Sequence, residues 1–256
     1  MSDFIKQTWD NSAEKHKDSH WASWGDKYAI SLEIDNIAQY IKDNDNVLDV
    51  GCANGYSTFE QLERKKIRIS GVDFSEKMIE YALERKQVKM LGDEINFSIG
   101  DVRDLNFNDS FFDVTYTTRV IINLQNWEEQ VIGILECVRV TKQGGIIILS
   151  EAFWEPLVLL NSLRAIKNLA PLVEHDFNRY LKRQKLEKLL IDKGLKFEFI
   201  DFSSIYYLGS RFLREMVTRI DDFPGYTNPI NEIFYNIEKD YSGGGFGIQQ
   251  ACIIYK

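Results

Sequence analysis

The chain has 256 residues, of which 44% are hydrophobic and 13% are aromatic. This supply of apolar side chains suits one large domain, or one domain with sizeable insertions, and excludes a disordered chain. The formal net charge is −8 and the longest basic cluster, residues 182–185, lies in an amphipathic helical pattern typical of a solvated face. Because nucleic-acid binding favours a basic stripe, this charge argues against a nucleic-acid partner.

The cysteines and histidines point to a reduced, metal-free protein. Cys52, Cys137 and Cys252 each lie in an apolar run, as reduced thiols of a cytoplasmic protein do. His16 and His20 can share a helix face, but their flank is hydrophilic, and no histidine or cysteine falls at metal-ligand spacing. A basic segment followed by an apolar one is missing at the N-terminus, and no apolar run approaches the length of a membrane span. We expect a cytoplasmic protein with no metal and no membrane partner; the oligomeric state is left open.

The first 24 residues are polar but contain three tryptophans, Trp9, Trp21 and Trp24. In one interpretation these rings attach a loose N-terminal arm to the domain. In the other, one or two of them cover a ligand site as a lid. From residue 25 to residue 42 the isoleucines recur at helical spacing, which predicts a helix.

Between residues 47 and 150, short apolar runs alternate with amphipathic ones. Such alternation is typical of a doubly wound α/β fold with a mostly parallel sheet. Ser75 is placed to cap the helix that includes Met78. A turn is expected at Gly144 and Gly145. The expected strands are 47–50, 67–72, 95–99, 112–117 and 146–150, and the other expected helices are 56–65 and 127–140.

After residue 150 the alternation stops. Residues 152–180 are helical in composition but fit no βα unit, and residues 204–245 are expected to be irregular because they contain Pro224, Pro229 and three consecutive glycines. Long insertions of this kind usually carry specificity. The expected segments are an N-terminal arm and helix with a possible lid role (1–45), a ligand-binding core (46–150), a cap insertion (151–180), a core helix and strand (181–203), a second cap insertion (204–246) and a final core strand (247–256).

The ends of the predicted strands carry polar residues, and α/β sheets bind their ligands at this edge. Asp73 lies 18 residues after Gly55, where a carboxylate can accept both hydroxyls of a ribose. Asp101 can accept a hydrogen bond from an exocyclic amine such as that of adenine. In chain order, the strand ends supply Asp49 with the turn at 51–55, then Asp73, then Asp101, then Thr117, Thr118 and Arg119.

Three acidic residues around one ligand favour a cationic or amine-rich molecule and disfavour a pyrophosphate. A dinucleotide fingerprint needs G-x-G-x-x-G. Here Gly51 and Gly55 are present, but Ala53 and Tyr56 stand where further glycines are needed. NAD or FAD is therefore the weaker alternative.

Five motifs occur in a fixed order along the chain: residues 49–55 (DVGCANG), 72–78 (VDFSEKM), 100–102 (GDV), 112–114 (FDV) and the glycine pair at 144–145. Together they resemble the class I S-adenosylmethionine-dependent methyltransferases. The resemblance covers residues 47–150 and the helix and strand at 181–203. The family commonly has a third glycine where Ala53 stands, which is a departure in the turn.

The resemblance implies a cofactor, a set of site residues and a sheet. The cofactor is S-adenosylmethionine, and the sheet has seven strands of which the last is antiparallel. In the implied site, Asp49, Gly51, Cys52, Ala53 and Gly55 hold the methionine portion, Asp73 the ribose, Phe74 and Met78 the faces of the adenine, and Asp101 and Val102 its amine edge, with Thr117 and Thr118 beside the cofactor.

The reaction of such a cofactor is an in-line displacement at the sulfonium methyl. An amine acceptor needs only to be neutral, whereas a hydroxyl usually needs a general base. His175 is the candidate base, and its alternative is an exposed loop histidine. Arg119 is a candidate to orient a substrate carboxylate or phosphate; alternatively it forms an ion pair with a nearby carboxylate such as Asp113 or Glu151.

The acceptor site is expected where the cap meets the ends of the strands. Asn123 and Glu151 follow strand ends and can contact either ligand, and Trp21 and Trp24 contact the acceptor if the arm is a lid. The second insertion is rich in tyrosine, and Tyr206 is the candidate among them for the acceptor. Core packing is the alternative for these rings.

Several subclasses lack their motifs in this chain. No Asn/Asp-Pro-Pro-Tyr run follows strand four, no paired-glutamate loop of protein arginine methyltransferases is apparent, and no catechol-type metal cluster is visible. We therefore predict methyl transfer to an O or N atom of a small metabolite. The alternatives are a nicotinamide-dependent oxidoreductase, a non-catalytic module that binds S-adenosylmethionine, and a tRNA methyltransferase, which needs a basic face.

Overall fold

The computed structural model describes residues 3–175, 177–218 and 225–256. Its centre is a seven-stranded sheet with the order β3-β2-β1-β4-β5-β7-β6. β7 runs antiparallel to both of its neighbours, and the other pairings are parallel. The predicted doubly wound sheet with an antiparallel last strand is confirmed. The strands are β1 (Asn46–Val50), β2 (Arg68–Asp73), β3 (Ile95–Ile99), β4 (Phe112–Thr118), β5 (Thr141–Ala152), β6 (Lys196–Ile200) and β7 (Gln249–Tyr255).

Helices follow most of the strands and also build the cap. Ser75 accepts a hydrogen bond from the Met78 N–H at 3.1 Å, so its predicted role as the N-cap of α4 is confirmed. The helices are α1 (Asp3–His16), η1 (His20–Ala22), α2 (Lys27–Ala38), α3 (Tyr56–Arg64), α4 (Glu76–Val88), η2 (Ile121–Asn123), α5 (Trp127–Val140), α6 (Trp154–Ile166), α7 (Arg183–Asp192), α8 (Ser204–Leu208), the π-helical η3 (Gly209–Leu213), α9 (Arg214–Val217) and α10 (Asn231–Asp240).

The N-terminal arm is not a loose segment, because α1 is a helix docked on the core. Ile5 and Ala13 are buried on one face of it. Lys6 forms an ion pair with Glu76, and the hydroxyl of Ser75 donates to Asp10, so α1 is bound to the start of α4. The spacing of Ile5, Trp9 and Ala13 is helical, but the polar residues between them conceal the pattern.

The expectation of irregular structure in residues 204–245 is wrong for much of that segment, which forms α8, η3, α9 and α10. These helices bury Tyr206, Arg211 and Arg214, and buried arginines do not register as an apolar stripe. Pro229 lies just before α10, whereas Pro224 falls outside the described residues.

The fifth strand also differs from its prediction. Gly144 and Gly145 lie inside β5 rather than in a turn before it. The pairing of β4 with β5 shifts register between Phe112 and Val114, and Gly144 has a φ of +77°. A bulge of this kind lets a strand continue through a pair of glycines.

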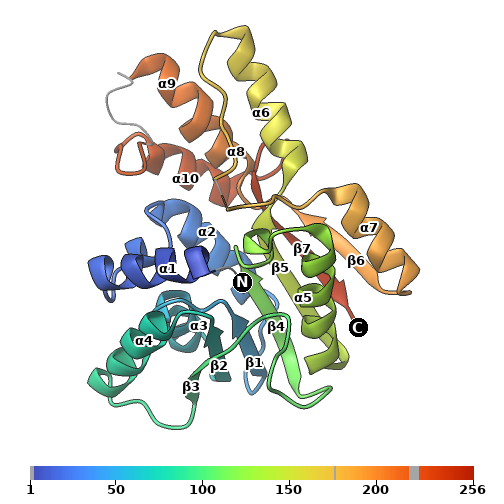
Figure 1. Cartoon of the computed structure of the whole chain (residues 1–256). Coiled ribbons are helices and arrows are strands. Elements are labelled where there is room, and N and C mark those ends of the chain that lie inside the picture. Colours follow the sequence, from blue (N-terminus) through green and yellow to red (C-terminus); the bar gives the residue numbers. More distant parts are fainter. Residues whose placement is uncertain (1–2, 176, 219–224) are drawn as a thin grey trace.

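Figure 1 shows that α6, α8, α9 and α10 gather at one end of the molecule, beyond the carboxyl end of β5. α10 touches α2, and α1 touches α4, so the N-terminal helices connect this cap with the core. The site described below lies at the same end of the sheet. In the part of the chain that the structure describes, no helix has both the length and the apolar character needed to cross a bilayer.

Candidate functional site

A pocket with about 790 Å³ of empty space, part of it open to solvent, lies at the carboxyl ends of β1, β2 and β4. β1 and β4 are neighbours in the sheet although they are not consecutive in the chain, so this edge is the topological switch point, where doubly wound sheets bind ligands. Three stretches of the lining span a strand end and the residues that follow it: 50–54 at β1, 72–74 at β2 and 118–120 at β4. The other lining residues are Trp9, Ser23, Tyr56, Ser57, Met78, Gly100, Val102 and Asn123.

In the turn after β1, every second residue has a left-handed backbone conformation. Gly51, Ala53 and Gly55 have φ values of +77°, +48° and +76°. A Cβ atom at Gly51 would lie 1.9 Å from Val120 Cγ2. Glycine is therefore required at 51 on two counts, conformation and space, whereas alanine at 53 carries the strain of a left-handed backbone.

Most N–H groups of this turn already donate within the protein. The N–H groups of Gly51 and Cys52 both reach the Val72 carbonyl, at 2.7 and 3.0 Å, and that of Gly55 reaches Cys52. The Ala53 N–H donates to Asp73. A phosphate-binding loop presents such groups to its ligand. The arrangement at this turn therefore disfavours a pyrophosphate.

Asp73 is the one carboxylate among the lining residues in the described chain. Its Oδ2 accepts the Ala53 N–H and its Oδ1 the Ser75 N–H, both at 2.9 Å. Burial raises the pKa of Asp73 to about 6, and these backbone donors oppose the shift. Each carboxylate oxygen keeps a further lone pair. Asp73 can therefore accept two more hydrogen bonds from a ligand in the pocket.

Next to Asp73 the pocket becomes an apolar slot lined by Phe74, Met78 and Val102. The structure brings these three predicted residues together. It does not place Asp101 with them: that carboxylate accepts the Nε–H of Arg103 at 3.0 Å and lies outside the pocket lining. Its neighbours Gly100 and Val102 line the pocket instead.

Asp49 and Thr117 lie behind the pocket rather than in its wall. Asp49 is fully buried and its Oδ2 accepts the hydroxyl of Thr58 at 2.7 Å, while its Oδ1 has no hydrogen-bond partner among the described residues. Burial raises the pKa of Asp49 to about 7. The Thr117 hydroxyl donates to Glu151 at 2.7 Å. Both residues support the turns from behind.

Glu151 is fully buried and serves the segment after β4 as an acceptor. It takes the N–H groups of Val120 and Ile121, each at 3.1 Å, in addition to the Thr117 hydroxyl. Burial raises the pKa of Glu151 to about 7. Its bonds fix the backbone of the pocket wall and leave it in no contact with the pocket space.

After β4, Thr118, Arg119 and Asn123 line the pocket as predicted. Arg119 forms an ion pair with a carboxylate, as the alternative for it expected, but its partner is the fully buried Glu33 of α2 rather than Asp113 or Glu151. Asp113 is bound to Lys142.

The three tryptophans of the N-terminal segment have different places. Trp9 lines the pocket and donates through Nε1 to Asn123 Oδ1 at 3.2 Å. The Trp24 ring lies 5.0 Å from the Arg119 guanidinium carbon. Trp21 is 39% exposed, packs against Gly25 and is outside the pocket lining, so the structure gives no support for its contact with an acceptor.

Asn54 connects the turn to the N-terminal segment. Its Nδ2 donates to the carbonyls of Lys17 and Ser19, at 2.6 and 2.8 Å. The chain between α1 and η1 is thereby held against the turn that follows β1. Together with Trp9, this contact makes the N-terminal segment one wall of the pocket.

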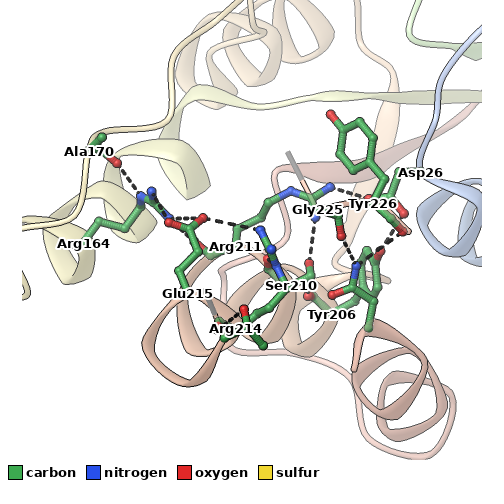
Figure 2. Close-up of polar contacts among 12 residues, drawn as sticks. Asp26, Arg164, Ala170, Tyr206, Ser210, Arg211, Arg214, Glu215, Gly225 and Tyr226 are labelled. Atoms are coloured by element: carbon green, nitrogen blue, oxygen red, sulfur yellow. Dashed lines mark hydrogen bonds and ion pairs between the residues drawn. The ribbon is translucent and has the colours of Figure 1, made fainter. Parts of the chain in front are cut away.

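His175 and Tyr206 lie away from the pocket. His175 is exposed and lines a separate groove between α6 and residues 172–175, so its position gives no support for the role of base. Tyr206 is fully buried in the cap and its hydroxyl donates to Asp26, which also pairs with Arg211. Figure 2 shows Tyr206, Arg211 and Asp26 converging in this network. Tyr206 is therefore part of the cap core, the alternative given for its ring.

Sequence reasoning missed several residues of the wall. Trp9 was one of three equivalent tryptophans, and only its helical spacing with Ile5 and Ala13 distinguishes it. Tyr56 and Ser57 form the first turn of α3, directly after the glycine turn, and that position was the available signal. No local signal distinguishes Ser23 or Val120, because tertiary packing places them.

The comparisons with known proteins agree with this geometry. A family model described as a methyltransferase domain matches residues 41–194. The chain is 34% identical over 121 residues to an uncharacterized methyltransferase of Schizosaccharomyces pombe, covering 44% of this chain and 42% of that protein. It is 25% identical over 163 residues to 27-O-demethylrifamycin SV methyltransferase of Amycolatopsis mediterranei, covering 61% and 57%. The matches thus span less than two thirds of these relatives.

Solved structures share the fold. Geranyl diphosphate C-methyltransferase from Streptomyces coelicolor, crystallised with Mg²⁺, geranyl diphosphate and S-adenosyl-L-homocysteine, has a TM-score of 0.58 at 16% identity, covering 88% of this chain and 77% of that one. A putative methyltransferase of Haloferax volcanii, in complex with its Trm112 activator, has a TM-score of 0.55 at 17% identity, covering 99% and 94%. At such identities the likeness is one of fold.

Proposed function

Since the chain belongs to the methyltransferase-domain family that matches residues 41–194, we propose that it methylates an O or N atom of a small metabolite. It is an S-adenosylmethionine-dependent methyltransferase with a Rossmann-like core. The single observation that carries the proposal is the pocket itself: a turn whose N–H groups are occupied, next to one carboxylate and an apolar slot.

The residues present fit this cofactor. Asp73 has acceptor capacity for two ribose hydroxyls, and Phe74, Met78 and Val102 form a slot for a flat base. Asp49, fully buried at the end of β1, accepts the Thr58 hydroxyl of α3 at 2.7 Å and so supports the turn at 51–55 from behind. The occupied N–H groups disfavour the pyrophosphate of a nicotinamide cofactor, the rival function on a similar sheet.

When bound, S-adenosylmethionine supplies a methyl group activated by its sulfonium. The protein's task is then to orient the acceptor and exclude water, and positioning alone contributes up to about 7–11 kcal/mol in well-oriented models. The titratable side chains of the lining, in the described part of the chain, are Cys52, Tyr56, Asp73 and Arg119. None of these is a free base at the β4 end, where the acceptor would enter. This favours an acceptor whose nucleophile is a neutral amine or an already acidic hydroxyl.

The names of similar proteins support the small-molecule class; they include 27-O-demethylrifamycin SV methyltransferase, ajmaline N-methyltransferase of Rauvolfia serpentina and phosphoethanolamine N-methyltransferase 1 of Arabidopsis thaliana. These are O- and N-methyltransferases by name.

Calorimetric titration with S-adenosylmethionine and S-adenosylhomocysteine tests the cofactor site, with NAD as the comparison ligand. We expect both sulfur ligands to bind and NAD not to bind. Absence of binding by either at millimolar concentration would sink the proposal. Incubation of metabolite fractions with a methyl-labelled donor then identifies the acceptor, and label should appear in a small organic product but not in tRNA or protein.

A further inference from the structure

Arg119 is the one cationic side chain that lines the pocket in the described part of the chain. Its backbone φ is +58°, a left-handed conformation that a residue with a Cβ adopts at a cost. The Asn123 amide donates to the Arg119 carbonyl at 2.8 Å, and the Arg119 N–H donates to the Ser150 carbonyl at 2.9 Å. The backbone on both sides of the side chain is therefore fixed.

Glu33 holds one end of the guanidinium. Its Oε2 pairs with Arg119 Nη1, and its Oε1 accepts both the Ser150 hydroxyl and the Gln249 amide, each at 2.8 Å. Because Glu33 is fully buried and its oxygens are both engaged, it cannot swing away with the arginine. Glu33 thus acts as a positioning residue for Arg119.

Trp24 holds one face of the same group, with its ring centre 5.0 Å from the guanidinium carbon. Trp24 is itself fixed by a hydrogen bond from its Nε1 to the Tyr226 hydroxyl at 3.2 Å. The Tyr226 ring in turn lies 4.9 Å from the Arg211 guanidinium carbon. Figure 2 shows Tyr226 close to Arg211 and Asp26 in the network of the cap.

The second edge of the guanidinium, formed by Nε and Nη2, makes no hydrogen bond to the residues that the structure describes. Among the described residues, Glu33 is the only hydrogen-bond partner of the Arg119 side chain, through Nη1. The Nε–H and one Nη2–H point the same way along the remaining edge, which is the geometry that binds a carboxylate or phosphate with two parallel hydrogen bonds. Arg119 lines the pocket and 16% of its side chain is exposed.

Glu33, Trp24, Tyr226 and Gln249 all lie outside residues 41–194, the part that matches the methyltransferase domain. Gln249 belongs to β7 of the central sheet, whereas Trp24 and Tyr226 belong to the N-terminal segment and the second cap insertion, and long insertions of this kind usually carry specificity. We propose that Arg119, positioned by Glu33 and Trp24, binds a carboxylate or phosphate group of the methyl acceptor. This proposal rests on the proposed function and assigns the acceptor to the oxyanion-bearing class.

The test uses full-length protein saturated with S-adenosylhomocysteine and titrated with three probes: benzoate, inorganic phosphate and benzyl alcohol. We expect an oxyanion, benzoate or phosphate, to bind and benzyl alcohol not to bind. Arg119→Gln should raise the dissociation constant of the bound oxyanion at least about tenfold, because two charge-assisted hydrogen bonds are lost. Arg103→Gln is the matched control, since Arg103 is also a partly buried, ion-paired arginine but lies outside the pocket lining. Its effect should stay within about twofold.

Arg119→Lys provides a second variant, which keeps the positive charge but lacks the planar guanidinium with its parallel N–H groups. It should raise the dissociation constant of the oxyanion at least about threefold. The proposal is overturned if neither oxyanion binds, or if binding is equal in wild type and both Arg119 variants. It is also overturned if Arg119→Gln weakens S-adenosylhomocysteine at least about tenfold but leaves 5′-methylthioadenosine unchanged, since Arg119 would then hold the cofactor's own carboxylate. Failure of wild type to bind S-adenosylhomocysteine would instead count against the proposed function.

Discussion

The Nε1 of Trp9 donates to Asn123 Oδ1 at 3.2 Å, across a separation of 114 residues. This bond joins α1 to the segment after β4 and passes along the wall of the pocket, which both residues line. The same helix is bound to α4 through the Lys6–Glu76 ion pair. α1 therefore bridges the two sides of the pocket, from the strand that supplies Asp73 to the strand that supplies Arg119.

Trp9→Ala should weaken the binding of S-adenosylhomocysteine by about tenfold, because an apolar wall and one hydrogen bond are lost. Trp21→Ala is the matched control, since Trp21 belongs to the same segment but lies outside the lining. Calorimetry on both variants gives the comparison. Equal affinities for the two variants would show that α1 is only packed beside the pocket.

Asp73→Asn should raise the dissociation constant of S-adenosylhomocysteine at least about tenfold, because hydrogen bonds to a charged acceptor contribute about 1.5–3 kcal/mol. Asp101→Asn is the control, because the Asp101 carboxylate is bound to Arg103 outside the lining. Thermal melts of both variants check that the turn, which Asp73 supports through Ala53, remains folded. A dissociation constant unchanged from that of wild type would contradict the ribose role.

Buried carboxylates give the stability of the unliganded protein a defined pH dependence. Burial raises the pKa of Asp49 from 3.8 to about 7 and that of Glu151 from 4.5 to about 7. Between the unfolded and the folded pKa, the folded state therefore binds more protons than the unfolded state. The contribution of these two carboxyl groups to stability is greatest below about pH 4, falls as the pH rises and levels off above about pH 7.

Asp49→Asn should remove one of the groups that take up a proton on folding. The free energy of unfolding should then change less steeply with pH, by up to about 1.4 kcal/mol per pH unit. Urea denaturation at several values between pH 5 and pH 7 measures the slope for wild type and variant. If the two slopes are the same, Asp49 is ionised in the folded state over this range.

The strand ends could be predicted from the sequence because each lies at a sharp change of pattern. Val47, Leu48 and Val50 form a short apolar run that stops at a glycine, and Asp73 stops the next one in the same way. Parallel strands are buried on both faces, so such runs identify them, and their carboxyl ends must meet at one edge. This local information points to Gly51 and Asp73, whereas the places of Phe74, Met78 and Val102 were implied by the resemblance to the methyltransferases.

The partners of the site residues could not be predicted in the same way. Arg119 pairs with Glu33 across 86 residues, whereas the sequence offered Asp113 and Glu151, which are nearer in the chain. Only the packing of α2 against the sheet brings Glu33 there. Asp101 shows the opposite case, since a residue two positions away, Arg103, takes the carboxylate that the pattern assigned to a ligand.

The cap should be held to α2 chiefly by the ion pair of Asp26 with Arg211. Asp26 is the N-cap of α2 and accepts the Ala29 N–H at 3.2 Å. Asp26→Asn keeps a good capping residue but leaves a buried arginine without its counter-charge, which costs about 3–5 kcal/mol. Tyr206→Phe, which removes one hydrogen bond to the same carboxylate, should cost about 1–2 kcal/mol.

Urea denaturation of these two variants measures the free energy of unfolding. The order of the two losses is the decisive result, because a helix-capping role alone would make Asp26→Asn nearly neutral. A larger loss for Tyr206→Phe than for Asp26→Asn would show that the ion pair contributes little.

Gly51 and Gly144 have the same φ of +77°, but they differ in surroundings. A Cβ at Gly51 would meet Val120 Cγ2 at 1.9 Å, whereas one at Gly144 would have no atom within 4 Å. Gly144→Ala should therefore cost only the left-handed backbone, about 1–2 kcal/mol. Gly51→Ala should cost the same backbone strain and, in addition, displace Val120. Because Val120 lines the pocket, this substitution should also weaken the binding of S-adenosylhomocysteine.

Adding Val120→Ala to Gly51→Ala should restore part of the loss, because the nearest remaining Val120 atom is Cβ at 3.3 Å. Denaturation and calorimetry on the single and double variants give the coupling between the two positions, with Val120→Ala alone completing the cycle. If Val120→Ala reduces the loss in the free energy of unfolding but not the loss in affinity for S-adenosylhomocysteine, the clash affects folding and not ligand binding. Additive effects in both measurements would show that the turn moves away from Val120 and that glycine at 51 is required for its backbone alone.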